Sequence, residues 1–262
     1  MTTPFLQLDA TELNTLIGVY LWPFTRIVGM IMVAPVFSAG MVSPRMRVLV
    51  SVTLTLIIVP LVPPPPPVNP MSVTGALITV QQLVIGIGMG FALQMVFDAL
   101  IIAGQASAMS MGLGFAIAVD PQRGVNVPVV SQYFMVLATL AFLAIDGHVM
   151  IIETLANSFA VLPVSETGLQ SRGIEQLVYW GTHMFAGAVK IALPAMTALL
   201  IVNLAFGVIS RAAPTLNLFA VGFPITMILG FVILMVSVPN IVDVFLGLLE
   251  SAFSNSTGIL LP

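Results

Sequence analysis

The stretch GALITVQQLVIGIGMGFALQMVFDALIIAG, residues 75–104, is mostly apolar and carries one charged side chain, Asp98. A helix rises about 1.5 Å per residue and needs roughly 20 predominantly apolar residues to cross the hydrocarbon core of a bilayer. The whole chain shares this character, because 59% of its 262 residues are hydrophobic and 6% are charged, whereas a soluble domain carries about 25% charged residues. We therefore expect an all-α integral membrane protein.

Outward from this stretch, the chain divides into six or seven hydrophobic segments. They run over Leu13–Val42, Val48–Val62, Met71–Ala103, Val129–Ile145, Val149–Leu162, Leu177–Ser210 and Leu216–Leu249. The second and fifth are short for a membrane crossing, and the last two are far longer than one crossing needs. This unevenness fits either ordinary kinked membrane helices or an assembly in which the helices do not simply cross a bilayer.

Prolines inside these segments predict kinks or breaks, because proline removes one backbone hydrogen bond and clashes with the preceding turn. They are Pro23 and Pro35 in the first segment, Pro194 in the sixth, and Pro224 and Pro239 in the last. Between segments, the five consecutive prolines at Pro63–Pro67 impose an extended polyproline II geometry and indicate a stiff spacer. Arg45, Arg47 and Arg211 lie at connections that the positive-inside rule places on the cytoplasmic side.

Three polar side chains, Gln94, Asp98 and Gln105, are spaced by four and seven residues and therefore share one face of the expected helix. An ionisable group in an apolar helix faces a partner helix or water, because exposing it to lipid costs about 2.5 to 3.5 kcal/mol. This face either lines a conduit or relays protons, or it makes a hydrogen-bonded contact with another helix. For Asp98 the helix contact is the simpler interpretation.

The sequence that follows this face is rich in small residues and methionine. Gly104, Ala108 and Gly112 recur at every fourth position and form a stripe that another backbone can approach closely. Met109 and Met111 add flexible, polarizable side chains that conform to irregular shapes. Spacing alone indicates a glycine-containing helix end followed by a turn, while the composition also suits a flexible segment that folds over or plugs an opening.

The C-terminal half contains two further sets of residues at helical spacing, each of which includes two polar side chains. His183, Lys190 and Pro194 share one face, as do Asn203, Gly207 and Arg211. Such side chains join membrane helices through hydrogen bonds worth about 0.6 to 2 kcal/mol. No residues resemble a catalytic triad, a phosphate loop or a dinucleotide fingerprint, and His148 lacks the further ligands of a metal site. With no cysteine and no Lys/Arg cluster, we expect no enzymatic activity, cofactor, metal or nucleic-acid partner.

A series of short motifs occurs in order from about Leu13 to Leu249. The motifs are YLWPFTR at 20–26, APVF at 34–37, QQLVIG at 81–86, MGLGFA at 111–116, VDP at 119–121, DGH at 146–148, ALP at 192–194, NLA at 203–205, RAAPTLN at 211–217 and GFP at 222–224. Each motif alone is weak, but the ordered set resembles the FliR/SctT family of type III protein-export gate subunits. The Pro63–Pro67 stretch and the tail after Leu249 match no pattern of that family.

The resemblance implies a subunit of the flagellar export gate in the bacterial inner membrane, at the flagellar basal body. Such a subunit is in contact with membrane lipid and assembles with several copies of FliP and FliQ, with FlhB and FlhA as further partners. The gate passes unfolded rod, hook and filament proteins. The resemblance also implies a FliP-like part at about 1–165 and a FliQ-like helical hairpin at about 175–250.

In this family, the loop at the position of residues 104–124 projects into the central channel as a plug. The resemblance gives this role to Met109, Met111, Gly112, Leu113, Gly114 and Phe115. Flexible apolar side chains would resist ions yet yield to a polypeptide. Assembly or gating positions are expected at Gln94, Asp98, Gln105, Lys190, Asn203 and Arg211. The alternatives are an export gate subunit of a virulence injectisome, or a self-contained secondary transporter with a substrate and proton site at Asp98 and Lys190.

Overall fold

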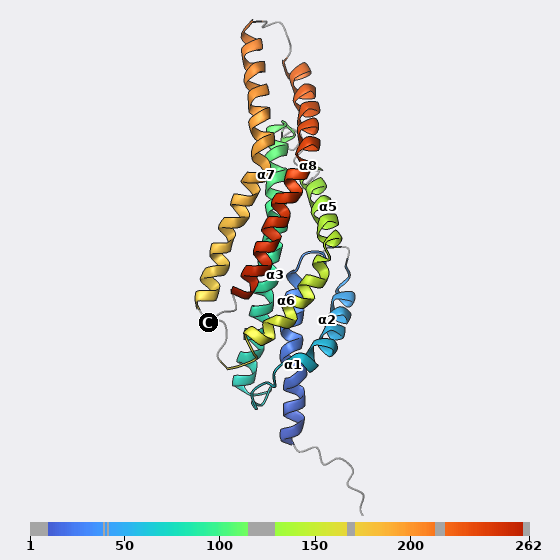
Figure 1. The fold of residues 1–262 in the computed structure, drawn as a ribbon, viewed down its shortest axis with the longest axis vertical. Helices are drawn as coiled ribbons and strands as arrows, with labels where there is room; N and C mark the ends of the chain where they lie inside the picture. Colours follow the sequence, from blue (N-terminus) through green and yellow to red (C-terminus); the bar gives the residue numbers. More distant parts are fainter. Residues whose placement is uncertain are drawn as a thin grey trace, which may run out of the picture. The chain divides into compact units, whose positions relative to one another are not determined.

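Every regular element that the structure describes is a helix, as the composition predicted. The computed structural model describes residues 10–38, 40, 42–114, 129–166, 171–212 and 218–258. Within these ranges the elements are α1 (Ala10–Val33), α2 (Pro44–Ile58), the 3-10 helix η1 (Val59–Leu61), α3 (Val73–Ser110), α5 (Val129–Ala144), α6 (Gly147–Val161), α7 (Ser171–Ala212) and α8 (Leu218–Gly258) (Figure 1). The described residues thus form an all-α protein.

Each predicted hydrophobic segment contains one α-helix, but the helix ends differ from the prediction. Five helices are long and apolar enough to cross a membrane, or six if α5 and α6 together count as one broken span. α1 ends at Val33, well before the expected Val42, whereas α3 continues to Ser110 and α8 to Gly258. Apolar composition predicts that a span exists, while the caps and the packing at its ends decide where the helix stops.

The helices continue through most of their prolines. Pro23 lies inside α1, Pro194 inside α7, and Pro224 and Pro239 inside α8, and none of them interrupts its helix. Of the two outcomes expected at these four prolines, a kink or a break, the break does not occur. Neighbouring groups in membrane proteins satisfy the carbonyl that each proline frees. Pro35 instead follows the end of α1, and Val36 beside it has a φ of 71°.

The chain forms two compact units, each built from distant parts of the sequence. The first contains Met1–Gln94, Asp146–Trp180 and Ser251–Pro262, and the second contains Met95–Ile145 and Gly181–Glu250. α3, α7 and α8 each contribute to both units. This division reflects compactness in space. The division into a FliP-like and a FliQ-like part rests on the family resemblance and stays a prediction.

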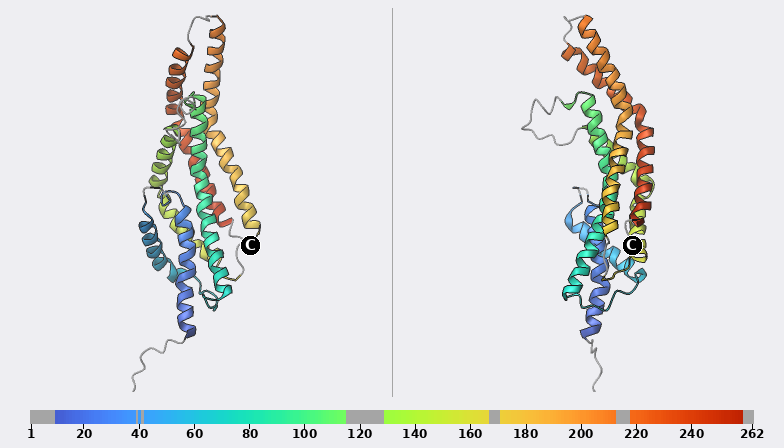
Figure 2. Two further views of the ribbon diagram at one scale, coloured as in Figure 1. Left: turned by 180° about the vertical axis from the view of Figure 1, so that it is seen from behind. Right: turned by 90° about the vertical axis from the view of Figure 1, so that its left-hand side faces the viewer.

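In the first unit, α1 packs directly against α3 through glycines. A Cβ added at Gly90 would lie 2.8 Å from the backbone oxygen of Met30, and one at Gly86 would overlap the backbone oxygen of Arg26. On the α1 side, Gly29 comes equally close to the backbone of α3. Small residues allow two membrane helices to approach in this way, and α1 lies beside α3 in both views of Figure 2.

In the second unit, three phenylalanines join α3, α5 and α8. The ring of Phe97 packs edge-on against Phe142 and Phe245, with centroids 5.6 Å and 5.3 Å apart. Further along α3, a Cβ added at Gly104 would lie 2.6 Å from Cα of Ser131 in α5, so another backbone approaches closely at the first residue of the stripe of small residues. The parts of α7 and α8 in this unit run side by side in every view (Figures 1 and 2).

Candidate functional site at the end of α3

α3 ends in a defined hydrogen-bonded turn built on Gly112. The N–H of Gly112 donates to the oxygen of Met109, and the N–H of Leu113 donates to the oxygen of Ala108, both at 3.0 Å. Gly112 itself has a φ of 83°. This pair of bonds around a left-handed glycine is the Schellman motif, which satisfies carbonyls that the helix end leaves without a donor. The sequence favours this stop because glycine adopts a positive φ without steric cost.

The first part of the segment expected as a plug loop is helical. Residues 104–110 belong to α3, so the chain leaves the helix at Met111. Packing explains the difference, because Gly104 lies against Ser131, whose Oγ donates to the oxygen of Ile101 at 2.9 Å. This contact with α5 holds the helix in place where glycine alone would weaken it. Phe115 and the rest of the expected loop lie outside the described residues.

The two methionines predicted at this site lie in different surroundings. Met109 is 62% exposed, whereas Met111 is 0% exposed. Met111 packs against Gly230 of α8, and a Cβ at Gly114 would lie 2.8 Å from Met109 Sδ. Gly112, Leu113 and Gly114 are half-buried. Met109 is therefore the exposed methionine at this helix end, while Met111 packs inside the chain.

The polar face of α3 is only partly interior. Gln94 and Asp98 are half-buried, and each takes part in an interaction within the structure. Gln105 is exposed. Gln94 and Asp98 are thus partly enclosed by the chain, whereas Gln105 lies at a surface. Gating or assembly roles for the three stay predictions.

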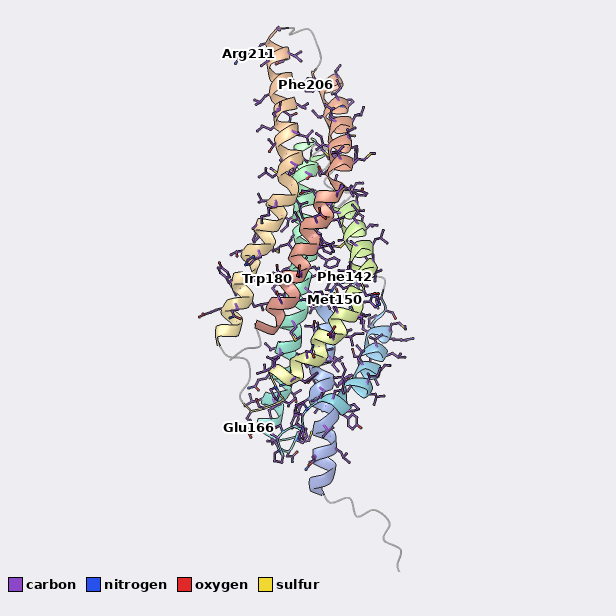
Figure 3. The ribbon with its side chains drawn as sticks, in the orientation of Figure 1. Phe142, Met150, Glu166, Trp180, Phe206 and Arg211 are labelled. Carbon is purple, nitrogen blue, oxygen red and sulfur yellow. The ribbon has the colours of Figure 1, made fainter. Side chains whose placement is uncertain are left out.

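Three polar residues of α7 were predicted as assembly or gating positions. Lys190, Asn203 and Arg211 are exposed, and with the other described residues they make no hydrogen bond or ion pair. Arg211 lies in the last turn of α7, at the end of the helix in Figure 3. These side chains therefore do not join helices among the residues described. A role in joining helices remains only for contacts with other chains, and it stays a prediction.

A buried polar site exists that the sequence did not reveal. Arg26 of α1 is 0% exposed, and its Nε donates to Oε1 of Gln82 in α3 at 2.8 Å. The two terminal nitrogens donate to the backbone oxygens of Ser158 at 3.0 Å and Leu162 at 2.9 Å, and one also donates to Ser158 Oγ at 3.1 Å. The ring of Phe159 covers the guanidinium, with its centroid 4.3 Å from Cζ. One side chain thus joins α1, α3 and α6.

The electrostatics of this site depend on the end of α6. The oxygens of Ser158 and Leu162 belong to its last turn and C-cap, where the helix dipole places partial negative charge. α6 has no basic residue of its own in that turn, so Arg26 supplies the cation. The sequence signal for this site was a lone arginine within an apolar span, because a charge there requires buried partners.

Comparison with known proteins places these sites within a family. The family model described as bacterial export proteins, family 1, matches residues 17–252. The chain belongs to this family.

Relatives within the bacterial export proteins, family 1, align with the chain over most of its length. The flagellar biosynthetic protein FliR of Pectobacterium carotovorum subsp. carotovorum is 37% identical over 237 residues, which is 90% of each chain. The protein of the same name from Escherichia coli (strain K12) is 34% identical over 236 residues, again 90% of each chain. That of Aquifex aeolicus (strain VF5) is 31% identical over 219 residues. The family match contains Arg26, the whole of α3 and the polar residues of α7.

Proposed function

We propose that the chain is a membrane subunit of the flagellar type III protein-export gate and that it assembles with FliP and FliQ into the export channel. Membership of the bacterial export proteins, with relatives named FliR aligned over 90% of each chain, carries this proposal. FlhB and FlhA are its further partners, and unfolded rod, hook and filament proteins are its cargo. The apolar helices and the flagellar relatives named FliR support a location in the inner membrane, at the flagellar basal body.

The uncovered apolar surface of α7 supports assembly with other subunits. α7 has 42 residues, which corresponds to a path of about 63 Å, whereas the hydrocarbon core of a bilayer is about 30 Å thick. Leu204 and Val208, close to the end of α7, are 63% and 70% exposed. A helix this long cannot place all of its apolar side chains in lipid, and apolar area left in water is costly. Partner subunits that cover it resolve this problem.

The described end of α3 supports a plug role for the residues that follow the helix. The Schellman motif holds Met109 and Leu113 at a fixed exit from α3. Met109 presents a flexible thioether to its surroundings, and such side chains adapt to irregular partners. A seal of this kind excludes hydrated ions because it has no charged group to solvate them. Met111 belongs to the base of the plug, since its side chain is buried within the chain.

Expression of the chain alone and together with FliP and FliQ tests the proposal. We expect the chain alone to aggregate or be degraded, and the co-expressed chain to purify as a stable complex with both partners. The chain should also restore swimming to an Escherichia coli strain that lacks its own FliR. A chain that is stable alone, transports a small solute and fails to bind FliP and FliQ would be the secondary transporter instead.

A further inference from the structure

Met111, at the end of α3, lies in a notch that Gly230 creates in α8. The side chain of Met111 is 0% exposed. A Cβ added at Gly230 would lie 2.5 Å from Met111 Cγ, 2.7 Å from its Cε and 3.0 Å from its Sδ. Carbon atoms in contact are normally about 3.5–4.0 Å apart. The thioether therefore occupies the space that any larger residue at position 230 would need.

This contact supplies a reason for glycine in the middle of α8. Glycine is less favourable than alanine in a helix interior, and Gly230 lies well inside Leu218–Gly258. Gly247 of the same helix has no atom within 4 Å of its added Cβ. Alanine would fit at 247 without any rearrangement, whereas at 230 it would displace Met111. The close approach is thus a property of one position and not of the helix as a whole.

The position of Met111 is coupled to that of its neighbours. Met111 directly precedes Gly112, and the hydrogen bonds of the Schellman motif return from Gly112 and Leu113 to α3. These bonds tie the backbone on both sides of Met111 into one rigid turn. Holding the Met111 side chain against α8 therefore also fixes the direction in which Met109 and Leu113 are presented.

We propose that Met111 and Gly230 form a latch that holds the end of α3 against α8 and so positions Met109 and Leu113 for closing the export gate. The role in closing the gate rests on the proposed function, whereas the latch itself rests on the contact between Met111 and Gly230. Met111 is accordingly a positioning residue, and Met109 and Leu113 are the side chains that it positions. Release of the latch moves them out of register with the partner subunits.

A change of side-chain size at both positions tests the latch in the full gate with FliP and FliQ. Overpacking a well-packed site usually shifts the equilibrium between the packed and the released state about tenfold or more. We therefore expect Gly230→Ala to raise the leak of protons across the membrane by about tenfold. Met111→Ala removes the side chain that forms the latch, so this variant should raise the leak as well, with or without Gly230→Ala. Gly247→Ala is the matched control and should leave the leak unchanged.

Disulfide crosslinking tests the contact between positions 111 and 230 separately from its effect on the closing of the gate. The chain has no cysteine, so in the pair Met111→Cys and Gly230→Cys every thiol of this chain is one of the two introduced. We expect this pair to close on oxidation in the assembled gate, and the pair Met111→Cys and Gly247→Cys to stay open. Equal crosslinking of the two pairs, or none of the first, would overturn the latch. A specific crosslink together with an unchanged leak in Gly230→Ala would overturn the gating role and leave the contact standing.

Discussion

Arg26 shows how one buried charge organises three membrane helices. Its hydrogen bonds reach Gln82 of α3 and the last carbonyls of α6, Ser158 and Leu162. In Arg26→Ala these oxygens lose their charged donor, and each buried unsatisfied acceptor costs about 1–3 kcal/mol. We expect the free energy of unfolding to fall by about 3 kcal/mol or more. The thermal midpoint of the complex purified with FliP and FliQ, followed by size-exclusion chromatography after heating, should fall by several degrees.

Two variants separate the hydrogen-bond geometry from the charge. Arg26→Lys keeps the positive charge but cannot reach three helices with a planar fork of donors, so its stability should lie between those of the wild type and Arg26→Ala. Arg45→Ala removes an exposed arginine and should leave the midpoint unchanged. A midpoint for Arg26→Ala that equals that of Arg45→Ala would show that the buried site does not hold the helices.

The contacts of individual residues are the part of the structure that the sequence predicts least well. Met111 was predicted as a soft surface residue because of its flexible side chain, yet it packs inside the chain against Gly230. Nothing in the spacing around 104–116 points to a glycine in α8. Arg26 was visible only as one letter of a family motif, although a charge within an apolar span always requires partners. Contacts between distant residues arise from tertiary packing, which a local pattern does not contain.

At the scale of elements, the contact between α1 and α3 depends on which glycine faces the partner helix. Gly86 and Gly88 both lie in α3, but a Cβ at Gly86 would overlap the backbone of α1, whereas at Gly88 the nearest atom is a methyl of Leu177 at 3.8 Å. We expect Gly86→Ala to separate the helices and to lower the free energy of unfolding by about 1–3 kcal/mol. Gly88→Ala should be neutral or stabilising by up to about 1 kcal/mol, because alanine is the better helix former. Thermal denaturation of the two purified complexes compares them directly, and equal midpoints would contradict this packing.

The elements themselves were predictable because long apolar stretches with few charges form α-helices in a membrane, where every backbone polar group needs a partner. All the expected segments became helices among the described residues. Their ends were harder to predict, since Gly104 suggested the start of a loop and instead supports a close contact between α3 and α5. Glycine in a membrane helix can mark either a helix end or a close contact with another helix, and the packing partner decides which of the two occurs.

For the whole molecule, a charged fraction of 6% indicated that much of the surface faces lipid. The exposed apolar surface of α7 offers a second explanation for the low charge. α7 leaves Leu204 and Val208 uncovered, and its polar residues Asn203 and Arg211 lie exposed beside them. An apolar surface with a few exposed hydrogen-bonding groups is typical of a helix that packs against other membrane helices. In the proposed gate, the low charge of this chain would reflect burial by partner subunits as well as by the bilayer.

Polar substitution of this surface tests whether partner subunits cover it. Leu204→Gln/Val208→Gln changes only exposed side chains, so we expect the fold of the chain to survive, with an unchanged helical circular dichroism spectrum. Burying two unpaired amides against FliP or FliQ costs about 1–3 kcal/mol each, which should reduce co-purification with these partners at least about tenfold. Glu175→Gln, at an exposed polar position of the same helix, introduces the same side chain outside the apolar surface and should bind normally. Full co-purification of the double variant would mean that this part of α7 faces lipid or water in the assembled gate.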